Sequence, residues 1–240
     1  KYQFAVPVFL DCDDSFCMDP IKLQNFCEQE CTYVDNKLLY KGRHVKALVV
    51  VHVFGNLADM PAIMKIAGRY GIKVIEDATE ALGSRYTEGE YAGKYAGTIG
   101  DFGAFSFNGN KIITGSAGGC FLTDDEEAAN KVRKWSTQAR ENAAWYQHEE
   151  LGYNYRMSNV VAGVVRGQFP YLKEHIAQKK AIYERYKEGL KGLPVSMNPI
   201  DLENSEPNYW LSCLIIDKEA MCKQVRGEQD VCYVKETGKS

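Results

Sequence analysis

The segment from Val45 to Val53 is the strongest constraint on the fold, because it reads V-K-A-L-V-V-V-H-V and is apolar at most positions. Such a run is typical of a central strand that is buried on both faces of a parallel sheet. Phe54-Gly55-Asn56 interrupts the run, Asp59 offers a cap for a helix that ends near Gly71, and residues 72–75 are strand-like again. A strand, helix and strand in this order form a right-handed crossover. The sequence therefore predicts an α/β fold with a mostly parallel central sheet.

A lysine follows the next predicted strand, which runs from Gly103 to Phe107. The chain continues as Asn108-Gly109-Asn110-Lys111 and enters a glycine-rich segment that ends at Gly119. A lysine at the end of a strand lies at the edge of the sheet where α/β proteins bind ligands. One interpretation is an ordinary surface lysine in a loop. Our hypothesis is that Lys111 is a nucleophilic amine that holds an aldehyde cofactor as a Schiff base.

Asp77 ends the strand that precedes this segment, so we expect both side chains at the carboxyl edge of one sheet. An aldehyde cofactor with a pyridine ring needs such a pair, because the amine forms the imine and the carboxylate keeps the ring nitrogen protonated. Ser106, Asn108 and the glycine segment are candidate donors to the cofactor phosphate. The alternative for Asp77 is a helix cap or an ordinary loop carboxylate.

Composition argues against several other classes of protein. The chain has 240 residues, 45% hydrophobic and 25% charged, which suits one large globular domain with a small further part. A formal net charge of -3 and the lack of a basic run argue against nucleic acid as a partner. No apolar stretch reaches the roughly 20 residues that span a bilayer, and no signal peptide is visible. We therefore expect a cytoplasmic protein with no membrane partner.

The eight cysteines and four histidines do not form a recognisable metal or disulfide pattern. No C-x-x-C pair occurs, no cysteine lies near two histidines at zinc-ligand spacing, and the histidines do not cluster. We expect reduced thiols and no metal site. No G-x-G-x-x-G follows the first strand, which argues against a Rossmann nucleotide binder.

The remaining segments complete the predicted organisation. We expect strands at residues 5–10, 119–123 and 208–216, a hairpin over 37–44 and a functional loop over 83–100. We expect one helix over 20–31 and a second that starts at the acidic run 124–127 and ends at about 140. A third helix is expected over 159–190, with a dip at Pro170. Residues 1–158 are expected to form a large domain, 159–192 a linking helix and 193–240 part of a small C-terminal domain. Because the chain opens at Lys1 and stops soon after a strand-like segment, we expect a fragment of a longer protein.

Four motifs stand in a fixed order along the chain: E-D-A-T-E-A-L-G-S at 76–84, G-T-I-G-D at 97–101, S-F-N-G-N-K at 106–111 and G-Y-N-Y-R-M-S-N at 152–159. In order and spacing they resemble the DegT-type sugar aminotransferases, and the segments 51–56 and 208–210 are similar as well. The resemblance covers roughly residues 5–216. It implies a fold-type I transferase, similar to aspartate aminotransferase, that depends on pyridoxal 5'-phosphate and carries part of a small C-terminal α+β lobe.

The resemblance implies roles for four residues at the expected sheet edge. Lys111 would be the Schiff-base lysine and would move protons between cofactor and substrate, while Asp77 would pair with the pyridinium nitrogen. Glu80, where many relatives carry glutamine, would lie near the phenolic oxygen of the cofactor. Ser106 would bind the cofactor phosphate.

The resemblance also implies a site shared between two subunits. Asn154, and with it Arg156, would reach the cofactor phosphate of the neighbouring subunit in a homodimer. The alternative for these two residues is a structural loop with a buried arginine. His52 is expected to pack near the site rather than to catalyse. Some relatives carry histidine in place of the lysine and perform dehydration, and Lys111 argues against that chemistry.

Two departures from the family pattern stand out. Relatives commonly read T-G-x-G-G after the lysine, whereas residues 114–119 read T-G-S-A-G-G, so an alanine replaces one glycine. The glycine-threonine helix start that holds the phosphate and the aromatic residue that stacks on the ring belong to an earlier part of the family, and they have no counterpart here.

These resemblances imply amino transfer to a nucleotide-linked 4-keto-6-deoxy sugar with glutamate as the donor, for the synthesis of a surface polysaccharide. The nearest branch is similar to the aminotransferases of the perosamine, legionaminic acid and bacillosamine pathways. The alternative is a non-catalytic fragment of the same fold that serves as a regulatory or interaction module.

Overall fold

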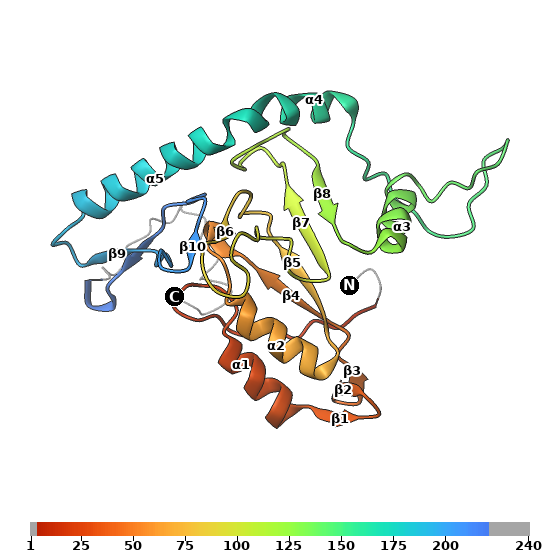
Figure 1. Cartoon of the computed structure of the whole chain (residues 1–240), viewed down its shortest axis with the longest axis horizontal. Coiled ribbons are helices and arrows are strands. Elements are labelled where there is room, and N and C mark those ends of the chain that lie inside the picture. The colour runs from red at the N-terminus through yellow and green to blue at the C-terminus, as the bar shows by residue number, and fades with distance from the viewer. Residues whose placement is uncertain (1–3, 221–240) are drawn as a thin grey trace, which may run out of the picture.

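The computed structural model describes residues 4–220, and its centre is a four-stranded sheet in the order β4-β5-β7-β8 (Figure 1). Its strands are β4 (Ala47–Val51), β5 (Lys73–Asp77), β7 (Phe102–Ser106) and β8 (Gly119–Leu122). The first three are parallel, with Val51, Asp77 and Ala104 in register, and β8 runs antiparallel to β7. The predicted α/β fold with a mostly parallel sheet is confirmed.

Local sequence signals fix the crossover between β4 and β5. Helix α2 (Met60–Tyr70) begins at Asp59, whose carboxylate accepts a hydrogen bond from the amide of Ala62. The helix ends at Gly71, which adopts the left-handed conformation with φ of 66°. Both ends of the helix therefore lie where the sequence predicts them.

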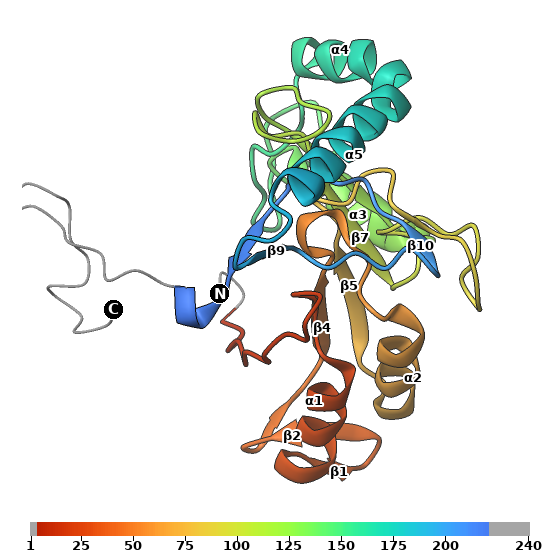
Figure 2. The same ribbon diagram turned by 90° about the vertical axis from the view of Figure 1, so that its left-hand side faces the viewer.

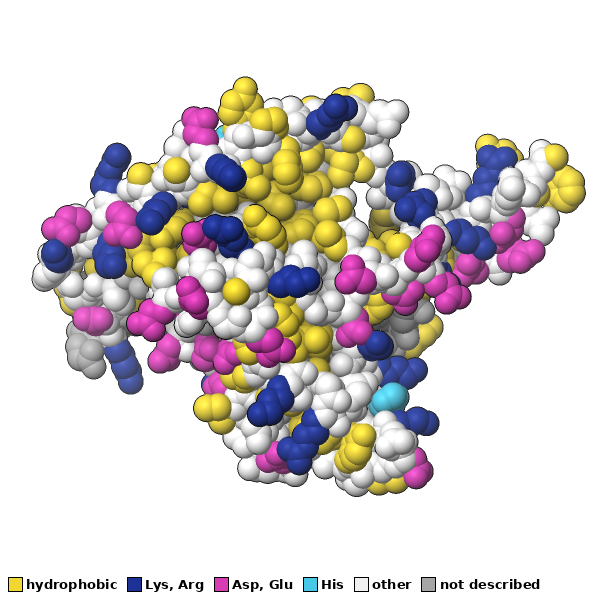
Figure 3. Space-filling model, in the orientation of Figure 1, with side chains coloured by type: hydrophobic (Ala, Val, Ile, Leu, Met, Phe, Trp, Pro, Cys, Tyr) yellow, Lys and Arg dark blue, Asp and Glu magenta, His cyan; other side chains and the backbone are white. Residues whose placement is uncertain are grey.

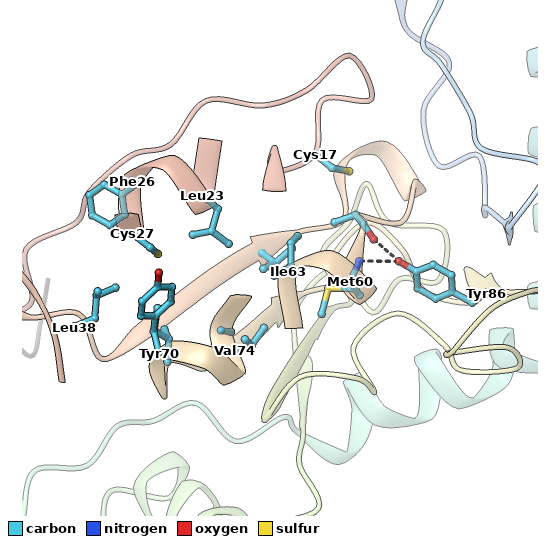
Figure 4. Close-up of a cluster of buried hydrophobic side chains, with 14 residues drawn as sticks. Cys17, Leu23, Phe26, Cys27, Leu38, Met60, Ile63, Tyr70, Val74 and Tyr86 are labelled. Atoms are coloured by element: carbon cyan, nitrogen blue, oxygen red, sulfur yellow. Dashed lines mark hydrogen bonds between the residues drawn. The ribbon is translucent and has the colours of Figure 1, made fainter. Parts of the chain in front are cut away.

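One face of the sheet packs against α2 and α1 (Pro20–Asn25), and the buried side chains between them form the main core (Figure 4). Leu23, Met60 and Val74 are at most 2% exposed. The hydroxyl of Tyr86 donates to the carbonyl of Ala58 and accepts from the amide of Met60 at 3.1 Å. Burial raises the pKa of Tyr86 far above its ordinary value, so the phenol remains a donor.

Strand β4 lies at the edge of this sheet, with no strand paired to its other side among residues 4–220. The side chain of Val49 points to the face opposite α2 and is 52% exposed. The prediction that residues 45–53 form a central strand buried on both faces is therefore wrong for the described chain. The reason is that α1 and α2 cover only one face of it.

The N-terminal helix α1 lies far from α4 (Asn159–Gln168) and α5 (Leu172–Gly189) in Figure 2. Helix α1 begins at the Asp19 cap and continues into η1 (Phe26–Glu30), which confirms the predicted helix. The predicted hairpin is confirmed within an antiparallel sheet of β1 (Thr32–Val34), β2 (Lys37–Tyr40) and β3 (Arg43–His44). The predicted strand over 5–10 is wrong. This segment pairs with no strand among residues 4–220, and Phe9 is 89% exposed.

The long helical segment crosses the carboxyl end of the sheet (Figure 1). It consists of α4 (Asn159–Gln168), η3 (Phe169–Tyr171) and α5 (Leu172–Gly189), so the predicted dip at Pro170 is confirmed. Helix α3 (Glu126–Ser136) begins at an Asp125 cap and ends earlier than predicted, because the chain leaves it for an arm that projects from the body of the molecule.

The final described segment contains β9 (Val195–Met197) paired with β11 (Leu214–Ile216), and it ends in η4 (Lys218–Ala220). Its β10 (Ser205–Glu206) pairs with β6 (Arg85–Tyr86), inside the predicted loop 83–100. The prediction of a strand over 208–216 is correct only for 214–216. Residues 208–210 are irregular because Tyr209 has a φ of 54° and the side chain of Asn208 binds the backbone. Cys222, Cys232 and the rest of the predicted small domain after residue 220 lie outside the described residues.

Candidate active site

Asp77 and Ser106 both lie at the carboxyl ends of the strands, as the last residues of the neighbouring parallel strands β5 and β7. The amide of Thr79 donates to Oδ1 of Asp77 at 3.2 Å. Among residues 4–220 no hydrogen bond reaches the other carboxylate oxygen, so Oδ2 is available to a ligand. The structure therefore brings Asp77 to the expected edge of the sheet.

The loop that carries Lys111 is held by backbone hydrogen bonds at both ends and by contacts with α4, α5 and Trp210. The amide of Phe107 donates to Gly118 at 2.9 Å, and the amide of Gly115 donates back to Phe107 at 2.8 Å. Ile113 is fully buried in an apolar cluster that α4 and Trp210 also line. On α5, the Nδ1–H of His175 donates to the carbonyl of Ile112 at 3.1 Å. These contacts hold the short turn in which the amide of Lys111 donates to the carbonyl of Asn108.

Ser106 and Asn108 adjoin one another on the open side of this loop. The amide of Asn108 donates to Oγ of Ser106 at 3.2 Å, which leaves the hydroxyl hydrogen of Ser106 free to donate elsewhere. The side chain of Asn108 is exposed and donates to Asn110 at 3.2 Å. The two residues thus present a hydroxyl and an amide where the sequence predicts donors to a phosphate.

The Lys111 amine lies between a carboxylate and an aromatic ring. Its Nζ is 3.9 Å from Oε1 of Glu80 and 4.1 Å from the centre of the Trp210 ring, and the lysine side chain is only 12% exposed. The other carboxylate oxygen of Glu80 accepts from the amide of Phe54 at 2.8 Å, within η2 (Val53–Gly55). Because the ion pair is partly exposed and long, its own contribution to stability is at most about 1 kcal/mol.

The glycine segment after Lys111 packs closely against its neighbours. A Cβ on Gly115 would lie 2.7 Å from Val161, and one on Gly118 would lie 2.8 Å from Met157. These glycines permit close packing of the loop against α4 and the segment before it. Ser106, Asn108 and the backbone of the glycine segment remain the candidate phosphate donors.

A fully buried pair, His52 and Glu76, supports the sheet from within. Nδ1 of His52 accepts from the amide of Ala58 at 3.1 Å, so the proton lies on Nε2, which donates to Glu76 at 2.9 Å. The amides of Gly97, Ile99 and Gly100 donate to the same carboxylate at 2.6–2.8 Å. His52 is packed in the interior beside β5, as expected. Glu76, whose support of the loop at 97–100 we did not predict from the sequence, neighbours Asp77 in β5.

Asn154 and Arg156 lie apart from Lys111, beside an open hollow of about 370 Å³ next to the end of α3. Other residues that line it are Ser136, Thr137, Gln138, Arg140 and Tyr146. Asn154 forms a β-bridge with Thr137, and the amide of Arg156 donates to Ser136 at 3.0 Å. Arg156 is exposed, so the alternative of a buried structural arginine is wrong.

Asn208 and Trp210 are the site residues that sequence reasoning missed. The side-chain amide of Asn208 donates to the carbonyls of Glu80 and Leu82 at 2.8 and 3.0 Å. The indole of Trp210 donates to the carbonyl of Asn110 at 3.0 Å. The two residues connect the segment after α5 with both loops of the site. No local pattern predicts contacts between positions so far apart in the chain.

Comparison with known proteins places this chain in a family. Residues 2–230 match the model of the DegT/DnrJ/EryC1/StrS aminotransferase family. The chain belongs to this family. Relatives include EpsN of Bacillus subtilis (strain 168), 41% identical over 90% of this chain and 53% of its own, and GDP-perosamine synthase of Escherichia coli O157:H7, 33% identical over 80% and 48%. The resemblance to the DegT type is thereby confirmed.

Solved structures of the DegT/DnrJ/EryC1/StrS family share the fold. DesV of S. venezuelae, crystallised with a ketimine intermediate, superposes with a TM-score of 0.73 at 26% identity over 89% of this chain and 53% of its own. A family member from Brucella abortus gives 0.75 at 25% identity over 89% and 54%. Fold type I is therefore established. The chain spans about half the length of the curated relatives it matches.

Further observations concern residues 4–220 alone. No group of three metal-ligating side chains occurs among them, and none of their helices combines the length and apolar character needed to cross a bilayer. Six cysteines in this part of the chain are free thiols.

Proposed function

We propose that this protein catalyses amino transfer with pyridoxal 5'-phosphate, and that Lys111 is its reacting amine. The observation that carries the proposal is the placement of Lys111 and Asp77 at one edge of the sheet, beyond β7 and at the end of β5. EpsN is provisionally named a pyridoxal phosphate-dependent aminotransferase, which supports the same cofactor.

The donor set at this edge fits a phosphorylated pyridine aldehyde. Within the described part of the chain the Lys111 amine makes no short hydrogen bond, and its nearest carboxylate oxygen there is 3.9 Å away. Asp77 has a free carboxylate oxygen, and Ser106 has a free hydroxyl hydrogen. Such a cofactor requires three groups from a protein: an amine for its aldehyde, a hydrogen-bond acceptor for its ring nitrogen, and a hydrogen-bond donor for its phosphate.

Each residue then has a defined task. The bound cofactor supplies a ring that accepts electrons from the carbon beside the transferred amine. Nζ of Lys111 acts as nucleophile and then removes and returns the proton of the reacting carbon. Asp77 accepts the hydrogen bond of the ring nitrogen, and Ser106 and Asn108 donate to the phosphate. Glu80 would face the phenolic oxygen of the bound cofactor, and its carboxylate also attracts the Lys111 amine.

The substrates follow from the relatives. GDP-perosamine synthases and a UDP-N-acetyl-3-dehydro-glucosamine 3-aminotransferase are named for nucleotide sugars, so we infer a keto nucleotide sugar as the acceptor. GDP-perosamine synthases from three organisms are among the relatives. We propose a 4-keto-6-deoxy sugar as the acceptor and glutamate as the donor. We propose that the enzyme works in the cytoplasm. Its amino-sugar product would serve the synthesis of a surface polysaccharide.

We further propose a homodimer that shares its sites. Asn154 and Arg156 line a hollow in which residues 4–220 place no lysine, so the described part of their own chain offers them no reacting amine. A second copy would supply one. In that arrangement Asn154 and Arg156 donate to the cofactor phosphate held at Lys111 of the partner.

A regulatory role is the second candidate function. A relative from Geobacillus stearothermophilus, 32% identical over 82% of this chain, is named a pleiotropic regulatory protein. In that case the fold would be retained without chemistry at Lys111.

Addition of pyridoxal 5'-phosphate to the chain separates the two functions. We expect the visible absorbance band of a lysine-bound cofactor, its loss in Lys111→Ala and its retention in the control Lys131→Ala, which removes an exposed lysine of α3. Borohydride reduction followed by peptide mapping should then find the label on Lys111. A band that persists in Lys111→Ala, or no label on Lys111, contradicts the enzymatic proposal and favours the regulatory one.

A further inference from the structure

We propose that Trp210 is a positioning residue for Lys111, and that its indole face holds the lysine amine at the edge of the sheet. The segment that follows α5 would then be part of the active site rather than a covering for it. The proposal rests on the proposed function, in which Lys111 is the reacting amine.

The contact between the amine and the ring is close and shielded. Nζ of Lys111 lies 4.1 Å from the centre of the Trp210 ring, and Trp210 is 5% exposed. It is the shortest lysine–ring contact in the part of the chain that the structure describes. The next two, Lys41 with Tyr40 and Lys131 with Trp135, measure 4.9 and 5.1 Å. An ammonium over an indole is attracted by the ring, and shielding from water strengthens this attraction.

The indole itself is held by the loop that carries the lysine. Its Nε1–H donates to the carbonyl of Asn110, the residue before Lys111, at 3.0 Å. Its ring packs with Phe107, Ile112 and Ile113 in the apolar cluster beneath the loop. The ring therefore has a fixed orientation relative to the lysine backbone. A mobile aromatic cover would lack this hydrogen bond.

Asn208 links the ring to the other neighbour of the amine. Its Oδ1 accepts from the amide of Trp210 at 2.9 Å, while its Nδ2 donates to the carbonyl of Glu80 at 2.8 Å. The amide of Asn208 also donates to Ser84 at 3.0 Å, and the hydroxyl of Ser84 donates to Gly55 at 2.7 Å. One side chain thus links the Trp210 backbone to the Glu80 loop, the two segments whose side chains lie nearest to Nζ.

This arrangement suits an amine that must leave and return during a reaction. An indole face attracts an ammonium group but accepts no strong hydrogen bond from it, so the amine has a defined resting place without being locked there. A second carboxylate at the same position would compete for the proton that Nζ has to carry. The aromatic face avoids this competition and keeps Nζ within reach of the sheet edge.

Nuclear magnetic resonance on the chain without cofactor tests the contact directly. With ε-¹³C-labelled lysine, the Lys111 methylene signal should lie upfield because of the ring current, and Lys111→Arg should remove it for assignment. Trp210→Leu should return the signal to the bulk lysine position, whereas Trp210→Phe should keep part of the upfield shift. The Lys131 signal, next to Trp135, serves as a check on folding in each variant. A Lys111 signal that is unchanged in Trp210→Leu overturns the proposal.

The rate of chemical modification separates positioning from packing. With trinitrobenzenesulfonate, Lys111 should react several-fold faster in Trp210→Leu than in the unaltered chain, and Trp210→Phe should restore the slow rate. Lys131 should react equally in all three. Equal rates at Lys111 in the three proteins overturn the positioning role. Both measurements omit the cofactor, so a chain that does not take up pyridoxal 5'-phosphate contradicts the proposed function without affecting them.

Discussion

Gly55 lies directly against Asn208, and a Cβ built on Gly55 would stand 1.9 Å from Oδ1 of the asparagine. Gly55 has a φ of 93°, a conformation that side chains disfavour. The contact joins the turn after β4 to the segment that carries Trp210. Gly55 therefore combines two requirements, a left-handed backbone and the absence of a side chain.

Gly55→Ala should destabilise the chain by about 2–4 kcal/mol, because overpacking adds to the backbone strain. Gly89→Ala is the matched control, since Gly89 has a φ of 74° and open space around it. It should cost only about 1 kcal/mol, from strain alone. Denaturant unfolding of the two variants checks the difference. Equal losses of stability would show that the contact with Asn208 contributes nothing.

Glu76→Gln should cost about 2–4 kcal/mol of unfolding free energy, since one buried carboxylate accepts from His52 and from three backbone amides. The amide group of glutamine turns one acceptor into a donor that faces other donors. Glu88→Gln, at an exposed position, should change stability by less than about 0.5 kcal/mol. The free energy of unfolding in denaturant measures both. A Glu76→Gln chain as stable as the Glu88→Gln chain would contradict the importance of this network.

Short-range signals account for the parts of the fold that were predicted from sequence. Asp19 with Pro20, and Asp59 with Gly71, mark helix ends through contacts within a few residues. The parallel order of β4, β5 and β7 follows from the crossover rule. This order in turn brings Asp77 and Lys111 to one edge of the sheet.

The errors and omissions arise from contacts between distant parts of the chain. Residues 5–10 have the apolar character of a strand, but they find no partner among the described residues. At Asn208 the side chain takes over hydrogen bonds that a strand would have made through its backbone. The close packing of Gly118 against Met157 and Val161 joins segments about forty residues apart, and the sequence does not predict it. The Trp210 contact with Lys111 depends on how the segment after α5 returns to the sheet, which no local pattern specifies.

Asp59→Ala should destabilise the chain by about 1 kcal/mol, because the carboxylate of Asp59 satisfies the amide of Ala62 in the first turn of α2. Asp59→Ser should restore most of the loss, since a hydroxyl can accept the same hydrogen bond. Thermal unfolding followed by circular dichroism compares the three proteins. If serine is no better than alanine, the cap does not determine the start of the helix.

The stability of the chain should fall in acid because of Glu76. Burial by itself works to raise the pKa of Glu76, but the hydrogen bond from His52 and those from the amides of Gly100 and Ile99 outweigh it and hold the pKa below the ordinary 4.5. A carboxyl with a lowered pKa in the folded state stabilises the protein above its unfolded pKa, and this contribution is lost as the pH falls through the folded value. The free energy of unfolding should therefore fall below pH 4.5 more steeply in the unaltered chain than in Glu76→Gln. Parallel curves for the two proteins would show that another group titrates instead.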